Sequence, residues 1–449
     1  MGRALRFPTK TEVRDVARLA APIVVVQVGL MMMGVVDAAI VGRHSAQGLA
    51  AVALGNVYFN SIVTLGHGTL MALDPLVAQA VGAKDIAAIE RSLQRGLVLC
   101  AMLAIPLSLL LIPGEWLLTP LRQPADVVPL AAEYARACIP GVLPYLAFIA
   151  LRQTVQAFAL VRPVVVAVVV ANIANVFLDW GMVFGRFGLP GMGAVGSGWA
   201  TTICRWLLAI MLLWGCRHAL LPFLRHWSRE DLALAPLWRM VRIGFPIGLQ
   251  LWIEFMAFSV ALLLVGMLGT IPLAGHQIAL MLAALTYMVP LGVSAAAAVL
   301  VGHAVGRGDP EAARRQAGAA LACGVGFMSV TALILIGFAP WLARAFTPDP
   351  RILAAAAILI PIAGVFQVFD GIQGVSGGVL RGAGDTRVPM LANLAGYAVV
   401  GLPPGAWLCF RQSWGAPGIW WGLSAGLAAV ALLLGWRVHV ILGGELRRL

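Results

Sequence analysis

Long blocks of apolar residues, separated by short polar segments, run along almost the whole chain. Each block holds roughly 20 residues, which is the length that an α-helix needs to cross a bilayer. The pattern predicts twelve transmembrane helices. They lie near residues 20–42, 50–73, 93–113, 131–151, 163–184, 194–215, 243–268, 272–300, 317–340, 352–375, 388–410 and 417–436.

Composition agrees with this pattern. Of the 449 residues, 61% are hydrophobic and only 11% are charged, whereas a soluble protein carries about 25% charged residues. Twelve spans and their loops leave no room for a large soluble catalytic domain. The apolar run from Leu19 to Gly42 follows a basic stretch but is too long for the core of a typical signal peptide. We therefore expect an all-α integral membrane protein whose first span is not cleaved.

The formal net charge of +12 is unevenly distributed along the chain. With both termini placed in the cytoplasm, 23 of the 31 Lys and Arg residues fall in cytoplasmic loops and tails. Arg205 is the only basic residue clearly inside a span. Such a bias is what the positive-inside rule predicts. The charge therefore indicates topology, and we expect no nucleic-acid partner.

The chain contains an internal repeat with a shift of 224 residues. LVAQAVGAKD at Leu76–Asp85 aligns without a gap on LVGHAVGRGD at Leu300–Asp309, and six of the ten positions are identical. The same shift places Pro22 on Pro246, which we interpret as a matched proline at the entry to a helix. Biased composition alone would not readily match a Gly-x-x-Asp loop and a proline at one shift.

The repeat predicts two lobes of six helices each. We place the N-lobe at residues 1–224 and the C-lobe at residues 225–449, joined by a cytoplasmic loop at about 217–242. Since six is an even number, the lobes should be related by a pseudo-two-fold axis along the membrane normal. Paired bundles of this kind commonly transport solutes by alternating access. Transport is therefore the leading hypothesis before any single residue is considered.

Ionisable side chains near the middle of a bilayer cost at least about 2.5–3.5 kcal/mol, so they usually face a cavity or a partner. Five acids are not obviously in loops: Asp37, Asp74, Asp179, Glu254 and Asp370. Asp74 precedes a proline and is interpreted as interfacial. Asp37 lies five residues from the outer loop, which fits either an interfacial or a functional role.

In the fifth span, Asn172, Asn175 and Asp179 are spaced i, i+3, i+7. At 3.6 residues per turn they form one polar stripe on an otherwise apolar helix. Amide and carboxylate oxygens suit a hard cation such as Na⁺, or a proton relay. The alternative is a hydrogen-bonding stripe that only holds helices together.

In the second half of the chain, Glu254 has Gln250 one turn before it, and Asp370 has glutamines on both sides, Gln367 and Gln373. Aromatic residues surround both acids in sequence. Carboxylates among aromatic rings form a reasonable site for lipophilic cations, because they combine charge with cation–π and apolar contact.

Other chemistry has little support. Gly191, Gly193 and Gly196 match a dinucleotide fingerprint, but no strand–turn–helix unit accompanies them, and GxxxxGK[ST] is absent from the sequence. The six cysteines are scattered without CxxC spacing. No nucleophile–base pair is visible in the spans. We expect no enzyme activity and no cofactor.

Several segments together resemble the multidrug and toxic compound extrusion (MATE) family, most closely its NorM-like branch. They are VDAAIVGR in the first span, LDPLVAQAVGAKD after the second, PIGLQLWIEF in the seventh, AGHQIAL leading into VGHAVGRGD, and FDGIQGVSGGVLRGAGDTRVP in the tenth. The resemblance extends from Pro22 through the twelfth span. It implies a V-shaped pair of six-helix lobes that exports cationic, often aromatic drugs in exchange for Na⁺ or H⁺.

Carried over by position, the resemblance implies two candidate cation sites. The C-lobe site for cation and substrate coupling contains Glu254 and Asp370, beside which we place Gln250 and Gln367. The N-lobe site contains Asp37, Asn175, Asp179 and a threonine, Thr202, with Thr201 as the alternative. Na⁺ could be held at Asp37, Asn175 and Asp179, or at Glu254 and Asp370.

One residue departs from the family pattern. Phe366 stands where related transporters can carry a tyrosine, which removes one oxygen from the C-lobe site. The sequence does not choose between the two candidate sites or between the two coupling ions.

The alternative function is a flippase of the related lipid-carrier group, moving lipid-linked oligosaccharides. It would need a cavity lined by Arg and Lys, whereas the charges in the spans are mainly acidic. We expect a monomer in the bacterial plasma (inner) membrane whose partners are the lipid bilayer, small organic cations and the coupling ion.

Overall fold

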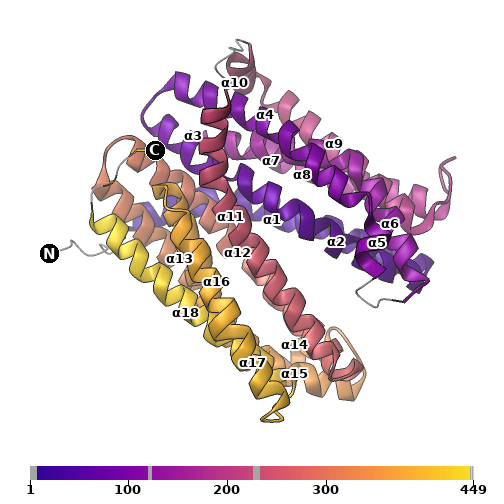
Figure 1. Cartoon of the computed structure of the whole chain (residues 1–449). Helices are drawn as coiled ribbons and strands as arrows, with labels where there is room; N and C mark the ends of the chain where they lie inside the picture. Colours follow the sequence, from indigo (N-terminus) through magenta and orange to yellow (C-terminus); the bar gives the residue numbers. More distant parts are fainter. Residues whose placement is uncertain (1–7, 120–123, 226–232, 445, 447) are drawn as a thin grey trace. The chain divides into compact units, whose positions relative to one another are not determined.

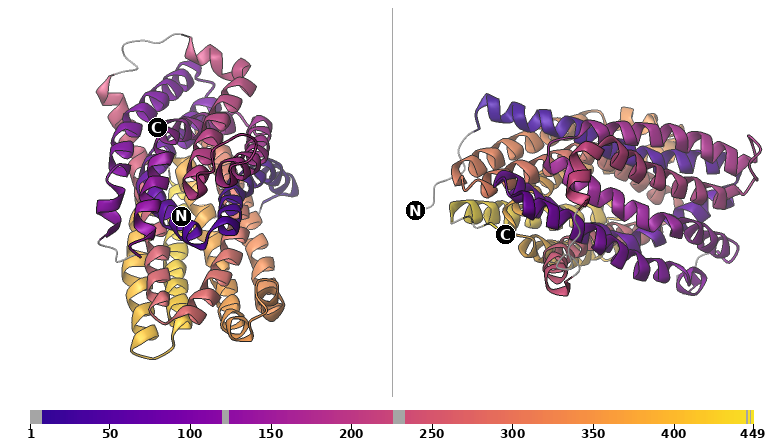
Figure 2. Two further views of the ribbon diagram at one scale, coloured as in Figure 1. Left: turned by 90° about the vertical axis from the view of Figure 1, so that its right-hand side faces the viewer. Right: turned by 90° about the horizontal axis from the view of Figure 1, so that it is seen from above.

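A computed structural model describes residues 8–119, 124–225, 233–444, 446 and 448–449. These residues form helices and connecting turns, with no strand among them (Figure 2). The helices are α1 (Lys10–His44), α2 (Ala46–Leu70), α3 (Leu73–Gly82), α4 (Ile86–Leu111), α5 (Gly114–Leu118), α6 (Val127–Cys138), η2 (Ile139–Gly141), α7 (Val142–Ala157), α8 (Arg162–Phe184), α9 (Gly193–Gly215), α10 (Arg217–Leu220), η3 (Leu221–Leu224), α11 (Leu234–Gly266), α12 (Thr270–Gly306), α13 (Pro310–Gly337), α14 (Ala339–Arg344), α15 (Pro350–Ala383), α16 (Arg387–Ala395), η5 (Gly396–Gly401), α17 (Leu402–Phe410) and α18 (Ala416–Gly443).

Eleven helical stretches in the described part of the chain are long and apolar enough to cross a membrane. The remaining expected span, 388–410, is also helical, but a π-helical turn, η5, separates α16 from α17. Turns of this type are rare and often occur at functional sites. The predicted all-α, multi-spanning fold is confirmed.

The described residues pack into two compact units. One contains Met1–Val24, Ala78–Lys84 and Leu249–Leu449, and the other contains Val25–Val77 and Asp85–Gly248. We call them the C-terminal and N-terminal units. The division into lobes at residues 224 and 225 stays a prediction, and residues 226–232 of the expected joining loop lie outside the described residues.

The repeated Gly-x-x-Asp segment has the same structure in both copies. Lys84 and its counterpart Gly308 adopt positive φ angles of 57° and 70°. The next residue caps a helix: the side chain of Asp85 accepts a hydrogen bond from Ala88 N at 3.0 Å, and that of Asp309 accepts one from Ala312 N at 2.9 Å. The motif therefore ends one helix and starts the next by side-chain capping.

The prolines matched by the repeat do not lie at helix entries, as the sequence had suggested. Pro22 lies inside α1 and Pro246 inside α11, because these helices begin earlier, at Lys10 and Leu234. The starts of both helices contain charged or amphipathic residues, so apolar runs mark only the membrane-embedded part of a longer helix.

Within the C-terminal unit, α15 packs against α12, α13 and α18 (Figure 1). Close packing of α18 against the η5–α17 segment depends on glycine. A Cβ atom on Gly422 would overlap the backbone of Gly405 and Gly401, so the two spans approach at backbone contact. In the N-terminal unit, α9 packs against α6, α7 and α8.

Candidate cation and substrate sites

In the N-terminal unit, three helices bring the predicted N-lobe residues together. Asn175 Nδ2 of α8 donates a hydrogen bond to Asp37 Oδ1 of α1 at 2.9 Å. Thr201 Oγ1 of α9 donates one to Asp37 Oδ2 at 3.1 Å. Asp179, one turn after Asn175, is fully buried. The polar stripe of α8 therefore faces α1 and α9. Residues of one site must face each other across neighbouring helices in this way.

The structure places Thr201, rather than Thr202, against Asp37. Thr202 Oγ1 instead donates to the carbonyl oxygen of Ala137 at 2.8 Å. Neighbouring residues of an α-helix point about 100° apart, so only one of the two threonines can face Asp37. The resemblance offered Thr202 first and Thr201 as the alternative, and Thr201 is the one that contacts Asp37.

This cluster has more oxygens than hydrogen-bond donors. Both carboxylate oxygens of Asp179, the Oδ1 of Asn175 and the Oγ of Ser197 are buried without a hydrogen-bond partner. Unpaired buried polar atoms are costly, and carboxylate, amide and hydroxyl oxygens are the ligands of hard cations. The oxygens present therefore fit a bound proton or Na⁺.

Ser197 was missed by the sequence reasoning. It precedes Thr201 by one helical turn, and its carbonyl oxygen accepts a hydrogen bond from Thr201 Oγ1 at 3.0 Å. The sequence signal that could have indicated Ser197 was its hydroxyl, one helical turn before the candidate ligand Thr201. No three His, Cys, Asp or Glu side chains in the described ranges are grouped to hold a metal, so a cation here would depend on two carboxylates and neutral oxygens.

In the C-terminal unit, Glu254 of α11 accepts two hydrogen bonds at the same oxygen. Gln373 Nε2 of α15 donates to Glu254 Oε2 at 3.3 Å, and Asn393 Nδ2 of α16 donates to it at 3.4 Å. The other amide atoms, Gln373 Oε1 and Asn393 Oδ1, are buried without a partner. Unused oxygens thus surround this carboxylate as well.

The remaining predicted C-lobe residues lie in different surroundings. Asp370 is 6% exposed and Gln250 is 4% exposed. Gln367 contacts neighbouring helices instead of an acid. Its Oε1 accepts from Thr331 Oγ1 at 3.1 Å, and its Nε2 donates to Ala283 O at 3.3 Å. The glutamine that reaches Glu254 is Gln373.

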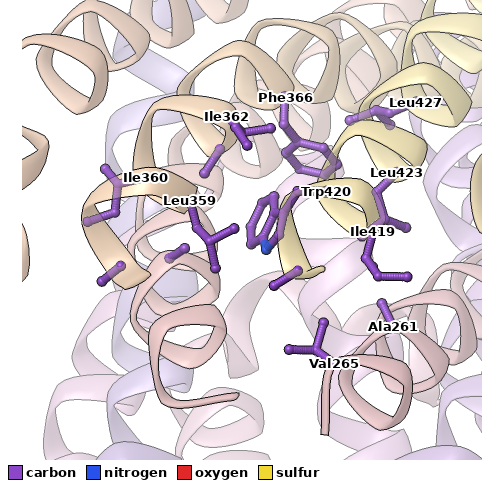
Figure 3. Packing of buried hydrophobic residues seen from close by; sticks show 14 of the residues in the cluster. Ala261, Val265, Leu359, Ile360, Ile362, Phe366, Ile419, Trp420, Leu423 and Leu427 are labelled. Atoms are coloured by element: carbon purple, nitrogen blue, oxygen red, sulfur yellow. The ribbon is translucent and has the colours of Figure 1, made fainter. Parts of the chain in front are cut away.

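Phe366, at the position of the departure from the family pattern, belongs to an aromatic core. Its ring lies edge-on to Trp420 at 5.9 Å and to Phe258 at 6.0 Å between centroids. Figure 3 shows Phe366 and Trp420 packed among Leu423, Leu427 and other aliphatic side chains. A hydroxyl is supplied nearby by Tyr397, whose ring packs against Phe258 at 6.2 Å and whose Oη is buried without a partner.

Asn393 and Tyr397 were also missed. Both lie in the expected span 388–410, where an amide and a phenol in an apolar helix were the signal. They are four residues apart, with Asn393 near the end of α16 and Tyr397 in the π-helical turn η5 that follows it.

Buried basic residues are more numerous than the sequence suggested. Arg152 of α7 and Arg381 of α15 are each only 6% exposed. Arg152 donates to Gln27 Oε1 at 3.2 Å, and Arg381 donates to Ser294 Oγ at 3.0 Å. Arg205 packs over two aromatic rings. The interpretation of Arg205 as the only basic residue inside a span is therefore corrected.

The fold and the candidate sites together define a class: an all-α membrane protein with many spans and with buried carboxylates in both units. The family model for MatE matches residues 22–180 and 246–407. The two matches start at residues 22 and 246, which is the shift of the internal repeat. The chain belongs to the MatE family.

Known relatives match over nearly the full length. The multidrug resistance protein NorM of Burkholderia vietnamiensis is 38% identical over 438 residues, covering 95% of this chain and 93% of that protein. A probable multidrug resistance protein NorM of Burkholderia mallei is 39% identical over 450 residues, covering 97% and 95%. The crystal structure of the eukaryotic MATE transporter AtDTX14 has a TM-score of 0.88 at 24% identity, covering 95% of both chains, which establishes the shared fold.

Proposed function

We propose that this protein is a secondary active antiporter that exports organic cations, including aromatic drugs, in exchange for Na⁺ or H⁺. The observation that carries the proposal is a pair of carboxylate clusters, one with the buried Asp37 and Asp179 and the other with the half-buried Glu254 and the buried Asp370, each next to oxygens that lack donors. The names of the relatives, multidrug resistance proteins at 38–39% identity, support drugs as the exported class.

Coupling requires that ion and drug favour different conformations of the carrier. A buried carboxylate without a full set of donors is stabilised by binding a proton or a cation. Binding shifts the conformational equilibrium only as far as the ion's affinity differs between the two states. Exchange of the bound ion for an organic cation at the acids would then link the two fluxes in opposite directions.

The test is drug efflux from proteoliposomes under separately imposed Na⁺ and H⁺ gradients, with ethidium as the fluorescent substrate. We expect efflux to follow at least one inwardly directed ion gradient and to stop when that gradient is removed. Ethidium movement that is independent of both gradients would contradict antiport.

Flipping of lipid-linked oligosaccharides remains the alternative function. The buried Arg152 and Arg381 are the observations in its favour, since a pyrophosphate needs basic partners. Both guanidinium groups, however, already donate to neutral side chains within the unit that contains them. The names of the relatives also favour drug export over lipid flipping.

A further inference from the structure

One charge inside the N-terminal unit has no role in the cation sites described above: the guanidinium group of Arg205. This residue lies close to the middle of the 23-residue helix α9. A charged side chain at such a depth is costly and usually faces a water-filled path or a partner. In the described part of the chain, no carboxylate forms an ion pair with Arg205, and its Nη1 is buried without a hydrogen-bond partner. The guanidinium group therefore has donors left for a ligand.

Arg205 does not lie on the apolar stripe of α9. Three large apolar side chains of this helix, Ile203, Trp206 and Ile210, are 38%, 44% and 57% exposed. Their i, i+3, i+7 spacing places them on one face, which suits contact with lipid. Successive residues of an α-helix are about 100° apart, so Arg205 points at least about 100° away from each of them. Since Arg205 is only half-buried, part of its side chain is accessible from a side of α9 other than this face.

Two aromatic rings hold the guanidinium group in place. Its Cζ lies over the ring of Phe59 in α2 at 4.1 Å and over the ring of Tyr145 in α7 at 5.4 Å from the centroids. Stacking on a ring uses the face of a guanidinium group, whereas its N–H donors lie in its plane. These donors form a rigid fork that matches the two oxygens of a carboxylate. The chemistry of Arg205 therefore favours a carboxylate as the group that it binds.

Arg205 lies one helical turn from the N-lobe acids. Thr201 precedes it by four residues on the same face of α9, about 6 Å away along the helix axis. Thr201 Oγ1 donates to Asp37 Oδ2 at 3.1 Å. One side of α9 therefore carries a contact to carboxylates and, one turn later, a guanidinium group. A ligand with a cationic group and a carboxylate several ångströms apart would complement both, whereas a simple cation would complement only the acids.

We propose that Arg205 binds the carboxylate of zwitterionic organic substrates, with the cationic group of the substrate directed toward Asp37 and Asp179. This inference rests on the proposed function and names a substrate class for it. It makes Arg205 a specificity-determining residue: the N-terminal unit selects zwitterions over cations of the same skeleton that lack the carboxylate.

The test uses two competitors of ethidium efflux in proteoliposomes, para-carboxybenzyltrimethylammonium and the corresponding carboxamide. They share the quaternary ammonium group and the ring, and differ only in a carboxylate or a neutral amide of the same shape. We expect the wild-type protein to bind the zwitterion about tenfold or more tightly, which is the order expected from a charge-assisted hydrogen bond. The ratio of the two inhibition constants is the readout, and a ratio of unity in the wild-type protein would overturn the proposal.

Variants assign the preference to one side chain. Arg205→Gln removes the charge and should abolish the preference for the zwitterion, whereas Arg205→Lys keeps the charge without the fork and should retain part of it. Arg152→Gln is the matched control, because Arg152 is a buried arginine of the same unit, 6% exposed, that already donates to Gln27 Oε1 at 3.2 Å. Its ratio should equal that of the wild type. A wild-type ratio in Arg205→Gln, or equal losses in Arg205→Gln and Arg152→Gln, would overturn the assignment.

A second measurement does not depend on transport. A ligand that binds the folded state raises its thermal stability, so the zwitterion should raise the melting temperature of the solubilised wild-type protein more than the amide does at equal concentration. Equal shifts would overturn the binding of a carboxylate at Arg205. A larger shift for the zwitterion, together with no gradient-driven ethidium efflux, would support the binding site and overturn the proposed function instead.

Discussion

Thr201 Oγ1 lies 3.1 Å from Asp37 Oδ2, although 164 residues separate the two in sequence. Thr202, the next residue, donates to the backbone of Ala137 at 2.8 Å. Two adjacent residues of the same type thus have separable roles. One contacts a candidate ion ligand, and the other holds α9 against α6.

We therefore predict different effects for Thr201→Val and Thr202→Val. Thr201→Val should weaken Na⁺- or H⁺-dependent efflux several-fold, because the hydroxyl beside Asp37 is lost. Thr202→Val should lower the free energy of unfolding by about 1 kcal/mol while leaving the dependence of efflux on ion concentration unchanged. Efflux titrations and denaturant unfolding of both variants check this. The same ion response in both would remove Thr201 from the site.

A second prediction concerns pH. If Asp37 and Asp179 hold Na⁺, the stabilisation of the protein by Na⁺ should weaken as pH falls, because protons compete for the same carboxylates. Asp37→Asn and Asp179→Asn should each abolish this stabilisation at high pH. Thermal unfolding with and without Na⁺ at high and low pH is the measurement. Wild-type ion responses in both variants at both pH values would leave the cluster with a structural role only.

Glu254→Gln and Asp370→Asn should each abolish ion-coupled efflux while the protein stays folded. Each substitution keeps the shape of the side chain but removes the carboxylate that, in the proposed mechanism, exchanges a proton or cation for drug. Glu311→Gln is the control, since Glu311 pairs with Arg315 at 3.7 Å and its side chain is 44% exposed. Proteoliposome efflux and size-exclusion profiles are compared. Wild-type transport by both acid variants would exclude them from coupling.

The helix caps of the repeat should be equivalent in energy. Asp85→Ala and Asp309→Ala should each lower stability by about 1 kcal/mol, and the Asn variants should retain most of it, because Asn also accepts the capping hydrogen bond. Asp126→Ala offers a matched control: Asp126 occupies an N-cap position but makes no side-chain capping hydrogen bond. The denaturant concentration at the midpoint of unfolding is the measurement. An equal loss of stability in all three Ala variants would contradict capping by Asp85 and Asp309.

The predicted topology can be tested by labelling single cysteines in place of Arg14, Arg225 and Arg411, which are exposed in the structure. Five native cysteines are buried and Cys323 is partly exposed, so Cys323→Ala gives a suitable background. We expect a membrane-impermeant thiol reagent to reach Arg411→Cys from outside and the other two only from the cytoplasm. Labelling of Arg14→Cys from outside alone would reverse the assignment of the termini.

Properties set by local sequence were predictable. The length of apolar runs determines helices that can cross a bilayer, because backbone polar groups in lipid must be satisfied within the helix. The stripe of Asn175 and Asp179 follows from helical periodicity alone. Likewise, the repeated Gly-x-x-Asp segment indicated a loop, and capping by Asp85 and Asp309 is a local interaction.

Sequence alone determined the class of protein, most of its helices and the candidate acids, because these depend on composition and on spacing along one helix. Only the tertiary structure decided which polar neighbours those acids have. It selected Thr201 over Thr202 and Gln373 over Gln367, and it added Asn393 beside Glu254. Such choices depend on the rotation of one helix against another, which the packing of side chains fixes and which no single helix records.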